Sequence, residues 1–513
     1  MVTKDEKKKL ISEIIAYWSK DWNKFVRDAL CARLDREQQA IIESVQHNPM
    51  TAVASGTARG KDFVAACASL CFMYLTPRFN EKGVLVGNTK VAMTAPTGRQ
   101  VKNIMTPEIR RLIRAARAKF PFCCPGRLVA DDIRTDYEEW FLTGFKADDN
   151  ATESWSGFHA ANTMFVVTEA SGISEIVYNA IEGNLQGNSR MFIVFNPNIT
   201  TGYAARAMKS ERFAKFRLSS LNAENVVKKQ VIIPGQVDYE WVKDKVINWC
   251  SPIQQTDFNE GEGDFNWEGS LYRPNDLFRV KVLGMFPKVS EDVLIPYEWI
   301  EIANRNWQEL QADGFIPAKS CKLGVDVAGM GRDNSVLCPR YGNYVPQFEV
   351  HQSSGRADHM HIVGMTVPYL KKKGAKAFID TIGEGAGVYS RLLEEEFTNA
   401  FSCKYSEGAD GLHDITGEYE FANMRAYLYW ALRDWLNPKN GFGAALPPCD
   451  QLMEEATETK WKFLSNGKII IEPKEDVKKR IKRSPDYMDA LANTFYCKGY
   501  DYISDEELLR DFL

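Results

Sequence analysis

The chain has 513 residues, more than one hydrophobic core usually organises, so we expect two or more domains. Its 64 basic and 68 acidic residues nearly balance, which excludes a uniformly basic nucleic-acid coat but permits local basic surfaces. The 11 cysteines form no CxxC pair, the 6 histidines form no HxxxH or HExxH pattern, and no run of ~18 apolar residues occurs. The sequence therefore predicts a soluble protein in a reducing compartment, without a zinc site or a membrane span.

The first part of the chain predicts a helical lead-in and then a nucleotide-type α/β domain. Apolar residues recur at helical spacing within residues 1–34. Continuous apolar runs at 50–54, 90–95, 163–169 and 190–196 are typical of parallel strands covered on both faces. We expect residues 1–225 to form an ATPase-type domain around a doubly wound, mainly parallel sheet.

The segment MTAVASGTARGKDFVAACASL, residues 50–70, reads as a strand, a loop of small residues and a helix. In a phosphate-binding loop of this order the backbone amides and the helix N-terminus face a β-phosphate, and Lys61 reaches the β- and γ-phosphates. The usual pattern GxxxxGK[ST] differs at two positions, and an ordinary glycine-containing turn is the alternative. The predicted nucleotide contacts are Ser55, Gly56, Thr57, Ala58, Arg59, Gly60, Lys61 and Asp62.

A hydrophobic strand that ends at Glu169 supplies the second signal for nucleotide hydrolysis. An acid at a strand tip beside a phosphate loop can orient the attacking water, so we predict Glu169 as the catalytic base. The position before this acid usually carries an aspartate that helps to hold magnesium, but here it is Thr168. We interpret Asp62 and Thr168 as an exchange, in which Asp62 supplies the carboxylate and Thr168 the hydroxyl of the Mg²⁺ shell. The alternative is that both substitutions are incidental drift and that the ATPase is weak.

The composition and the predicted structure of the chain change after residue 225. Residues 226–310 include the Gly-rich, acidic stretch 259–269 and predict a loop-rich linker or lid subdomain. Residues 311–513 then predict a second α/β domain: a three-stranded meander that begins at 321–329, a strand at 375–380 and a helix within 484–496. A short acidic tail, 504–513, ends the chain.

Aspartates of this second domain are predicted to converge. Asp326 lies within an apolar strand, Asp380 ends another, and Asp486 and Asp489 share one face of a helix that Ser484 can cap. Hydrolysis of a phosphodiester by two metals needs carboxylates from separate segments around ions ~4 Å apart.

Solvated surface carboxylates are the alternative, but acids on apolar strands are costly to bury without a metal or another partner. Asp486 is favoured over Asp489 as a direct ligand, and Asp333 is an outside candidate. The predicted metal ligands and catalytic residues of this site are Asp326, Asp380, Asp486 and Asp489.

Several stretches, in this order, resemble the large terminase subunit of tailed bacteriophages. They are LDREQQAII (34–42), VAMTAPTGRQVKNIM (91–105), GFHAANTMFVVTEASGI (157–173), FIVFNPN (192–198) and VLGMFP (282–287). Residues 311–513 are similar to the RNase H-like nuclease of the same family. The resemblance implies that Gln38 lies on the adenine side, that Asn196 senses the nucleotide state, and that Arg59 or Arg99 reaches the γ-phosphate.

The resemblance also implies an activity. The protein would bind ATP and Mg²⁺, drive double-stranded DNA into a procapsid and cut concatemeric DNA with two Mg²⁺ or Mn²⁺ ions. Its partners would be the portal protein, a small terminase subunit and further copies in a ring of five. It would act in the cytoplasm of the infected host and transiently on the portal, not in the mature virion. A helicase-nuclease of DNA repair and a DNA-binding scaffold with a degenerate ATPase site are the alternatives.

Three basic segments are candidate DNA contacts: 108–120, 371–376 and 474–484. Solvated helix faces are the commoner reason for such runs. We favour 474–484 for contact with DNA phosphates, because it directly precedes the Asp486 helix.

Overall fold

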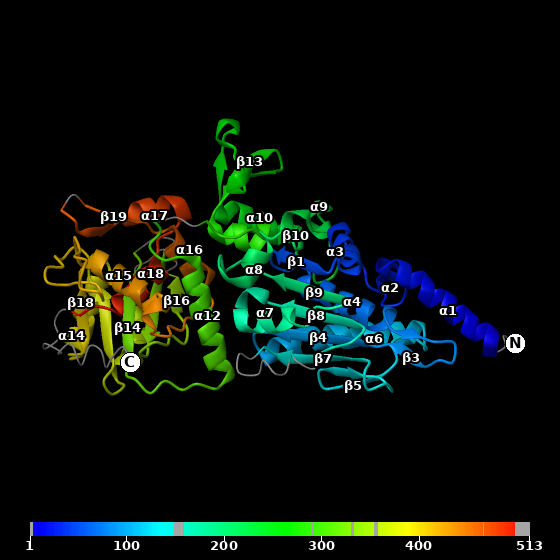
Figure 1. The fold of residues 1–513 in the computed structure, drawn as a ribbon. Coiled ribbons are helices and arrows are strands. Elements are labelled where there is room, and N and C mark those ends of the chain that lie inside the picture. Colours follow the sequence, from blue (N-terminus) through cyan, green and yellow to red (C-terminus); the bar gives the residue numbers. More distant parts are fainter. Residues whose placement is uncertain are drawn as a thin grey trace. The chain divides into compact units, whose positions relative to one another are not determined.

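The computed structural model describes residues 4–147, 155, 158–288, 292–329, 333–352, 358–464 and 466–497. The chain forms two compact units (Figure 1). The N-terminal unit comprises residues 1–274 and 278–287, and the C-terminal unit comprises 275–277 and 288–513. The predicted acidic tail lies outside the described residues.

The N-terminal unit is built on an eight-stranded sheet with the order β10-β1-β9-β8-β4-β7-β6-β5. All neighbours from β10 to β7 are parallel, whereas β6 and β5 add an antiparallel edge. The four strands expected from apolar runs are present. The strands are β1 (Met50–Ser55), β4 (Thr89–Ala95), β5 (Arg127–Val129), β6 (Asp132–Arg134), β7 (Phe141–Lys146), β8 (Asn162–Thr168), β9 (Asn188–Phe195) and β10 (Ala214–Leu218).

Both faces of this sheet are buried. Alternate residues of the central strands, such as Val166 and Phe165 of β8, belong to two separate hydrophobic clusters. Helices α1 to α4 and α6 contribute to the first cluster, and α7 and α8 to the second, which confirms the doubly wound arrangement. The helices are α1 (Lys4–Lys20), α2 (Trp22–Asp28), α3 (Arg36–His47), α4 (Lys61–Leu75), α5 (Gly98–Gln100), α6 (Thr106–Lys119), α7 (Glu175–Glu182), α8 (Gly202–Ala207) and α9 (Glu224–Val227).

The region expected to be a loop-rich linker is more regular than predicted. It contains α10 (Tyr239–Trp249) and an antiparallel sheet of β11 (Cys250–Ile253), β13 (Ser270–Pro274) and β12 (Phe265–Trp267). Aromatic packing stabilises it: the rings of Phe265 and Phe278 stack with centroids 5.0 Å apart. Most of this region belongs to the N-terminal unit, and α11 (Asp276–Phe278) lies at the junction. A two-stranded pair, β2 (Arg78–Phe79) and β3 (Leu85–Gly87), completes that unit.

The C-terminal unit contains a five-stranded sheet with the order β16-β15-β14-β17-β18. The predicted meander is present, because β14, β15 and β16 pair in antiparallel fashion, while β17 and β18 run parallel to β14. This is the α/β architecture expected for an RNase H-like unit. Its strands are β14 (Lys322–Asp326), β15 (Asn334–Arg340), β16 (Glu349–Gln352), β17 (Lys376–Asp380) and β18 (Ala400–Cys403), beside the separate pair β19 (Trp461–Phe463) and β20 (Ile469–Ile471).

Helices cover both faces of the second sheet. Residues of α13 and α14 form one hydrophobic core with Val325 and Leu337. On the other face α18 lies directly on β14, because a Cβ atom at Gly324 would come within 1.8 Å of the carbonyl oxygen of Ala490. The helices are α12 (Tyr297–Ala312), α13 (His359–Leu370), α14 (Gly385–Glu394), α15 (Met424–Leu436), α16 (Asp450–Glu458), α17 (Lys474–Ile481) and α18 (Asp486–Asn493).

One detail of α18 differs from the prediction. Pro485 occupies the N-cap position and no side chain caps the helix, so the expected backbone cap by Ser484 is wrong. Asp489 and Asn493, on the acidic side of the helix, are fully buried. The helix is enclosed because β14 covers one side and α15 and α16 pack against it as well.

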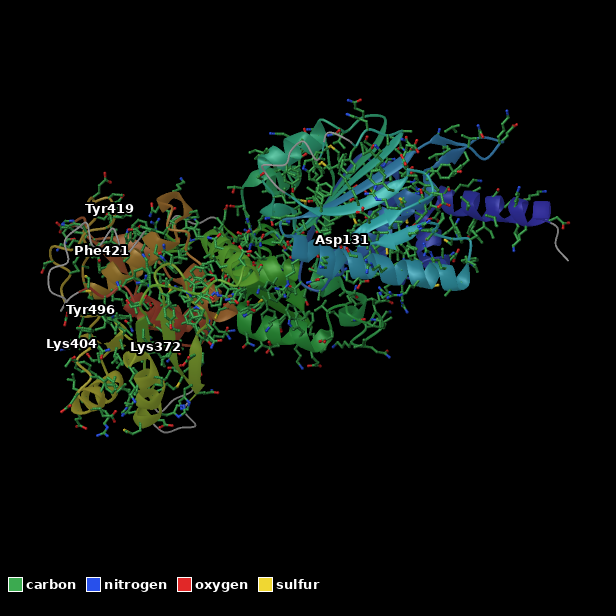
Figure 2. The ribbon with its side chains drawn as sticks, turned by 90° about the horizontal axis from the view of Figure 1, so that it is seen from below. Asp131, Lys372, Lys404, Tyr419, Phe421 and Tyr496 are labelled. Carbon is green, nitrogen blue, oxygen red and sulfur yellow. The ribbon has the colours of Figure 1, made fainter. Side chains whose placement is uncertain are left out.

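A smaller aromatic cluster lies beside this core. Tyr419 and Phe421, labelled in Figure 2, both pack against Trp430, with ring centroids 5.8 and 6.3 Å away. Trp430 in turn meets Trp461 edge to face at 4.8 Å. Within the described residues, no helix combines the length and the apolar character needed to cross a bilayer.

Candidate nucleotide and nuclease sites

The loop between β1 and α4 has the backbone of an anion-binding turn. Ala58 and Gly60 adopt left-handed conformations, with φ of 52° and 75°. Left-handed residues at such positions of a loop turn successive N–H groups toward one point, and the N-terminus of α4 adds the positive end of the helix dipole. The N–H groups of Ala58, Arg59 and Gly60 donate to no backbone carbonyl in the part of the chain that the structure describes. They are therefore suited to hold phosphate oxygens.

The first two loop amides behave differently from the prediction. The N–H of Gly56 donates to the carbonyl of Leu218 at 2.9 Å, and that of Thr57 to the carbonyl of Lys281 at 2.6 Å. These two groups are occupied within the N-terminal unit and do not face an open phosphate site in this structure. The anion-binding part of the loop is thus confined to its second half.

Lys61 joins the loop to two other strand ends. Its Nζ lies 2.7 Å from Oε1 of Glu169 and 3.0 Å from Oδ1 of Asn196. Burial alone would lower the pKa of Lys61, but the carboxylates of Glu169 and Asp62 outweigh burial and raise it. Asn196 also donates from Nδ2 to the carbonyl of Ser55 at 2.7 Å. One asparagine therefore contacts both the phosphate-loop lysine and the strand that carries the loop.

Sheet order explains how Glu169 reaches this lysine. Strand β8 ends next to Glu169 and is separated from β1 only by β9, which ends next to Asn196. Glu169 has φ of 49°, an uncommon left-handed conformation for a residue with a side chain. Such outliers concentrate at functional sites, where the surrounding structure holds them.

Asp62 and Thr168 have different partners in this structure. Asp62 Oδ2 lies 3.5 Å from Lys61 Nζ, and burial together with the nearby Glu169 raises the pKa of Asp62, while Lys61 opposes this. Thr168 is buried and donates from Oγ1 to the carbonyl of Thr94 at 3.4 Å. The carboxyl group of Asp62 thus lies beside the loop lysine, whereas the hydroxyl of Thr168 is engaged by a backbone carbonyl.

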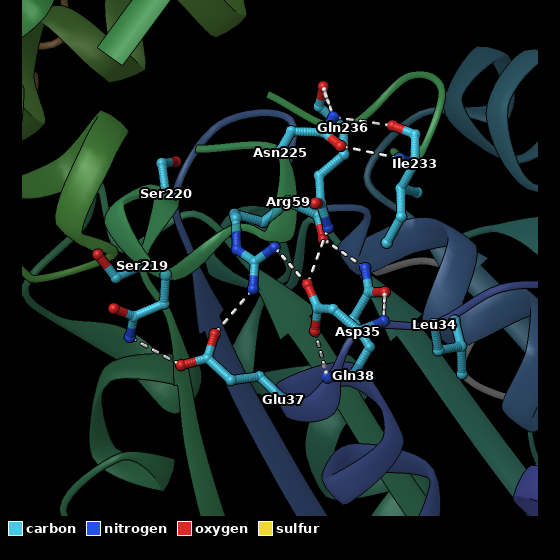
Figure 3. Close-up of polar contacts among 12 residues, drawn as sticks. Leu34, Asp35, Glu37, Gln38, Arg59, Ser219, Ser220, Asn225, Ile233 and Gln236 are labelled. Carbon is cyan, nitrogen blue, oxygen red and sulfur yellow. Dashed lines mark hydrogen bonds and ion pairs between the residues drawn. The ribbon is translucent and has the colours of Figure 1, made fainter. Parts of the chain in front are cut away.

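Arg59 does not have the environment expected of an arginine that contacts a γ-phosphate. Its fully buried guanidinium pairs with Asp35 at 2.6 Å and with Glu37 at 2.7 Å (Figure 3). Gln236 adds a hydrogen bond to Asp35 at 2.8 Å. Since breaking a buried ion pair is strongly unfavourable, the structure argues against Arg59 in that role. Arg99 is exposed on α5 and stays a candidate.

Gln38 is buried in the same network, not open to a nucleobase. Its Oε1 accepts from the N–H of Asp35 at 3.0 Å, and its Nε2 donates to the carbonyl of Arg59 at 2.8 Å. The first contact belongs to a capping box at the start of α3. In this structure Gln38 thus fixes the phosphate loop to α3 (Figure 3).

The four predicted aspartates of the C-terminal unit are near enough to influence one another electrostatically. Asp326 and Asp380 end the parallel neighbours β14 and β17, so both lie at the same edge of the sheet. Burial, together with repulsion from Asp489, Asp486 and Asp380, raises the pKa of Asp326 well above its usual value, although Lys474 opposes this. Burial likewise raises the pKa of Asp380 to about 6.

Helix α18 supplies the other two carboxylates. Asp486 is buried and accepts from the N–H of Asn334 at 3.1 Å, and burial raises its pKa. Asp489 is fully buried and accepts from the hydroxyl of Tyr429. Burial would raise the pKa of Asp489, but the cations Lys474 and Arg425 outweigh it and hold the pKa below its usual value.

Lys474 is a site residue that the sequence analysis did not single out. Its Nζ lies 2.6 Å from Oδ2 of Asp489 and 3.9 Å from Oδ2 of Asp326. The basic run 474–484 was the available signal, but it pointed to DNA phosphates. Other cations of this run also pair with acids: Lys478 lies 2.8 Å from Asp333.

Within the segment 371–376, residues 371–374 are exposed and Ala375 is buried. Lys372, labelled in Figure 2, is exposed, and its Nζ lies 4.9 Å from the ring centroid of Tyr369. This turn lies between α13 and β17. It stays a candidate DNA contact.

The donor chemistry of the four aspartates suits hard divalent cations, which prefer carboxylate oxygens. Their oxygens are not gathered around one point, however. Among the residues that the structure describes, no three of these four carboxylates bring an oxygen each within 4.8 Å of one another. Lys474 neutralises part of the acidic charge in this arrangement.

No protein-family model matches the sequence. The chain is 23% identical over 525 residues to the probable terminase large subunit of Enterobacteria phage P7, covering 97% of this chain and 94% of that protein.

Two solved structures are similar to part of this chain. One is the nuclease domain of the large terminase subunit of bacterial virus Sf6. It is 22% identical, the match covers 40% of this chain and 100% of that chain, and the TM-score is 0.34. The other is a variant ATPase domain of the Thermus phage P74-26 large terminase. It is 14% identical, the match covers 51% of this chain and 97% of that chain, and the TM-score is 0.34. The likeness to the phage P7 protein, which spans nearly the whole of both sequences, identifies the chain as a relative of the phage terminase large subunits.

Proposed function

We propose that the chain is a viral DNA-packaging motor, in which ATP hydrolysis drives double-stranded DNA into a procapsid and an endonuclease cuts the concatemer. The observation that carries this proposal is the pairing of two sites in one polypeptide. In the N-terminal unit Lys61 contacts Glu169 and Asn196 beside a phosphate-type loop. In the C-terminal unit two strand ends and helix α18 carry four aspartates that influence one another electrostatically. The whole-length relationship to a terminase large subunit supports it.

In the ATPase step Lys61 would leave Glu169 and bind the β- and γ-phosphates. Glu169, freed from this ion pair, would accept a proton from the attacking water. Asn196 contacts both Lys61 and the loop strand, so it would transmit the change in Lys61 to β9. A bound Mg²⁺ would neutralise charge on the phosphates, with Asp62 and Thr168 as candidates to hold its hydration shell.

In the cleavage step Asp326, Asp380, Asp486 and Asp489 would hold two Mg²⁺ or Mn²⁺ ions, which supply an activated water and stabilise the leaving oxygen. Lys474 would keep the buried acids partly neutralised before metal binds. The electrostatic influence of Asp380, Asp486 and Asp489 on Asp326 supports the assignment of these acids to one site.

The exchange of metal partners between Asp62 and Thr168 predicts a specific rescue. Asp62→Thr and Thr168→Asp should each impair ATP turnover, because the Mg²⁺ shell then has two hydroxyls or two carboxylates. The double variant restores one of each and should recover a substantial part of the wild-type rate. Steady-state phosphate release at saturating ATP measures this. A double variant no faster than the slower single variant would reject the exchange.

We further propose that the protein assembles as a ring, of five copies, on the portal of the procapsid, and that a small terminase subunit selects the DNA. It would act in the host cytoplasm and leave the filled particle. These partners follow from the family relationship, and exposed cations such as Lys372 supply candidate contacts to DNA phosphates.

A packaging assay tests the proposal. Purified protein, ATP, linear double-stranded DNA and empty procapsids should yield DNA protected from added nuclease, and ATP turnover should rise when DNA and procapsids are present. A DNA-repair helicase-nuclease would unwind and degrade DNA without needing procapsids, whereas a scaffold with a degenerate site would show no ATP turnover. Either of those results would refute the packaging function.

A further inference from the structure

Two histidines and an aspartate form a cluster that the two proposed sites do not use. His351 lies on β16, Asp358 caps the N-terminus of α13, and His361 lies in the first turn of that helix. On the shared neighbour β15, Asp326 pairs with Val336, whereas His351 pairs with Ser335, the residue directly before Val336. Because successive strand residues point to opposite faces, His351 lies on the other face of the sheet from the nuclease aspartates.

The three side chains are close enough to share one ion. One potential ligand atom from each lies within 4.8 Å of the other two. The imidazoles of His351 and His361 have centroids 4.0 Å apart. Asp358 is oriented by the helix, since its Oδ1 accepts from the N–H of His361 at 3.3 Å, while its Oδ2 lies 3.5 Å from Nε2 of His351.

His351 supplies an independent sign that a ligand belongs here. Its Nε2 is buried and has no hydrogen-bond partner among the residues that the structure describes. Buried polar nitrogens are nearly always satisfied, because an unmade hydrogen bond is costly. The 3.5 Å separation from Asp358 is long for a hydrogen bond. It is close to the edge of about 3.4 Å expected for a tetrahedron of ligands ~2.0–2.1 Å from Zn²⁺.

We propose that His351, Asp358 and His361 bind a divalent transition-metal ion of the Zn²⁺ type. Two imidazoles and one carboxylate suit such ions, whereas Mg²⁺ and Ca²⁺ prefer oxygen ligands throughout. The ion would connect the end of β16 to the start of α13, and water would complete its coordination. The sequence analysis expected no zinc site because HxxxH spacing is absent; here a strand and a helix bring the histidines together.

Neighbouring histidines provide matched controls. His359 belongs to the same helical turn, but its Nε2 lies 2.7 Å from Oε2 of Glu384 and is already partnered. His359→Gln can keep that hydrogen bond. His413 is exposed elsewhere in the C-terminal unit, so His413→Ala removes one histidine without touching the cluster.

Calorimetric titration of Zn²⁺ into the chelator-treated full-length protein tests the site, with excess Mg²⁺ present to fill the carboxylate sites. We expect one Zn²⁺ per chain. His351→Ala, His361→Ala and Asp358→Asn should each weaken binding by more than the roughly 10–100-fold that loss of an outer partner costs. Co²⁺ should give visible d–d absorption in the wild type and in both controls, and lose it in the three variants.

The outcome is decisive in either direction. His361 and Asp358 are exposed, so His361→Ala and Asp358→Asn should retain the metal-free thermal midpoint of the wild type even if His351→Ala does not fold. Wild-type protein that binds no Zn²⁺ under these conditions, or variants that bind it as tightly as the controls, would overturn the proposal.

Discussion

Replacing Asp326 by alanine should abolish DNA cleavage and leave ATP turnover unchanged. Asp326 ends β14 next to β17, and three other aspartates raise its pKa together with burial. Removing it takes a carboxylate from the centre of the cluster, so the loss should exceed the roughly 10–100-fold cost of removing an outer partner of a metal site. Linearisation of supercoiled plasmid with Mn²⁺ measures cleavage, and phosphate release measures ATPase.

Asp333→Ala is the matched control for this experiment. Asp333 directly precedes β15 in the same unit, but its carboxylate pairs with Lys478 at 2.8 Å instead of joining the cluster. The control should cut DNA at close to the wild-type rate. Persistent cleavage by Asp326→Ala, or loss of cleavage by Asp333→Ala alone, would place the nuclease site elsewhere. A parallel loss of ATPase would indicate global misfolding, which a thermal melt would detect.

The positions of the acids were predictable from sequence because they follow from local pattern and sheet rules. Asp326 and Asp380 interrupt or end apolar runs, and parallel strands place such residues at one edge. Glu169 was found in the same way at the end of β8. Strand β10 was missed, because its residues alternate between charged and apolar in AKFRL and lie at the sheet edge.

What could not be predicted depends on tertiary partners. Arg59 belongs to the loop by sequence, yet its guanidinium is fixed by Asp35 and Glu37, more than 20 residues earlier in the chain. Gln38 is similarly engaged by the backbone of Arg59. Lys474 reads as part of a solvated basic run, and only the packing of α17 against the site brings it to Asp489. Side-chain type and spacing do not encode such pairings across separate elements.

Replacing Glu169 by glutamine should separate ATP hydrolysis from ATP binding. The change removes the proposed base, and general-base catalysis typically contributes 10²–10⁴-fold, so turnover should fall by about that factor. Binding should be retained or strengthened, because Lys61 would no longer have to leave an anionic partner that lies 2.7 Å away. Lys61→Ala, in contrast, should lose both binding and turnover. Fluorescent nucleotide titration and phosphate release measure the two quantities.

Glu175→Gln is the control, because Glu175 is a partly buried acid on α7 that pairs with Arg206. It should hydrolyse ATP at the wild-type rate. If Glu169→Gln kept its turnover, the base would have to be another acid near Lys61, and Asp62 would be the first to test. If it lost binding instead, the Lys61–Glu169 pair would be needed to build the pocket, and the lysine could not act as the phosphate ligand that the loop geometry suggests. Retained binding with lost turnover is the result that only a catalytic Glu169 explains.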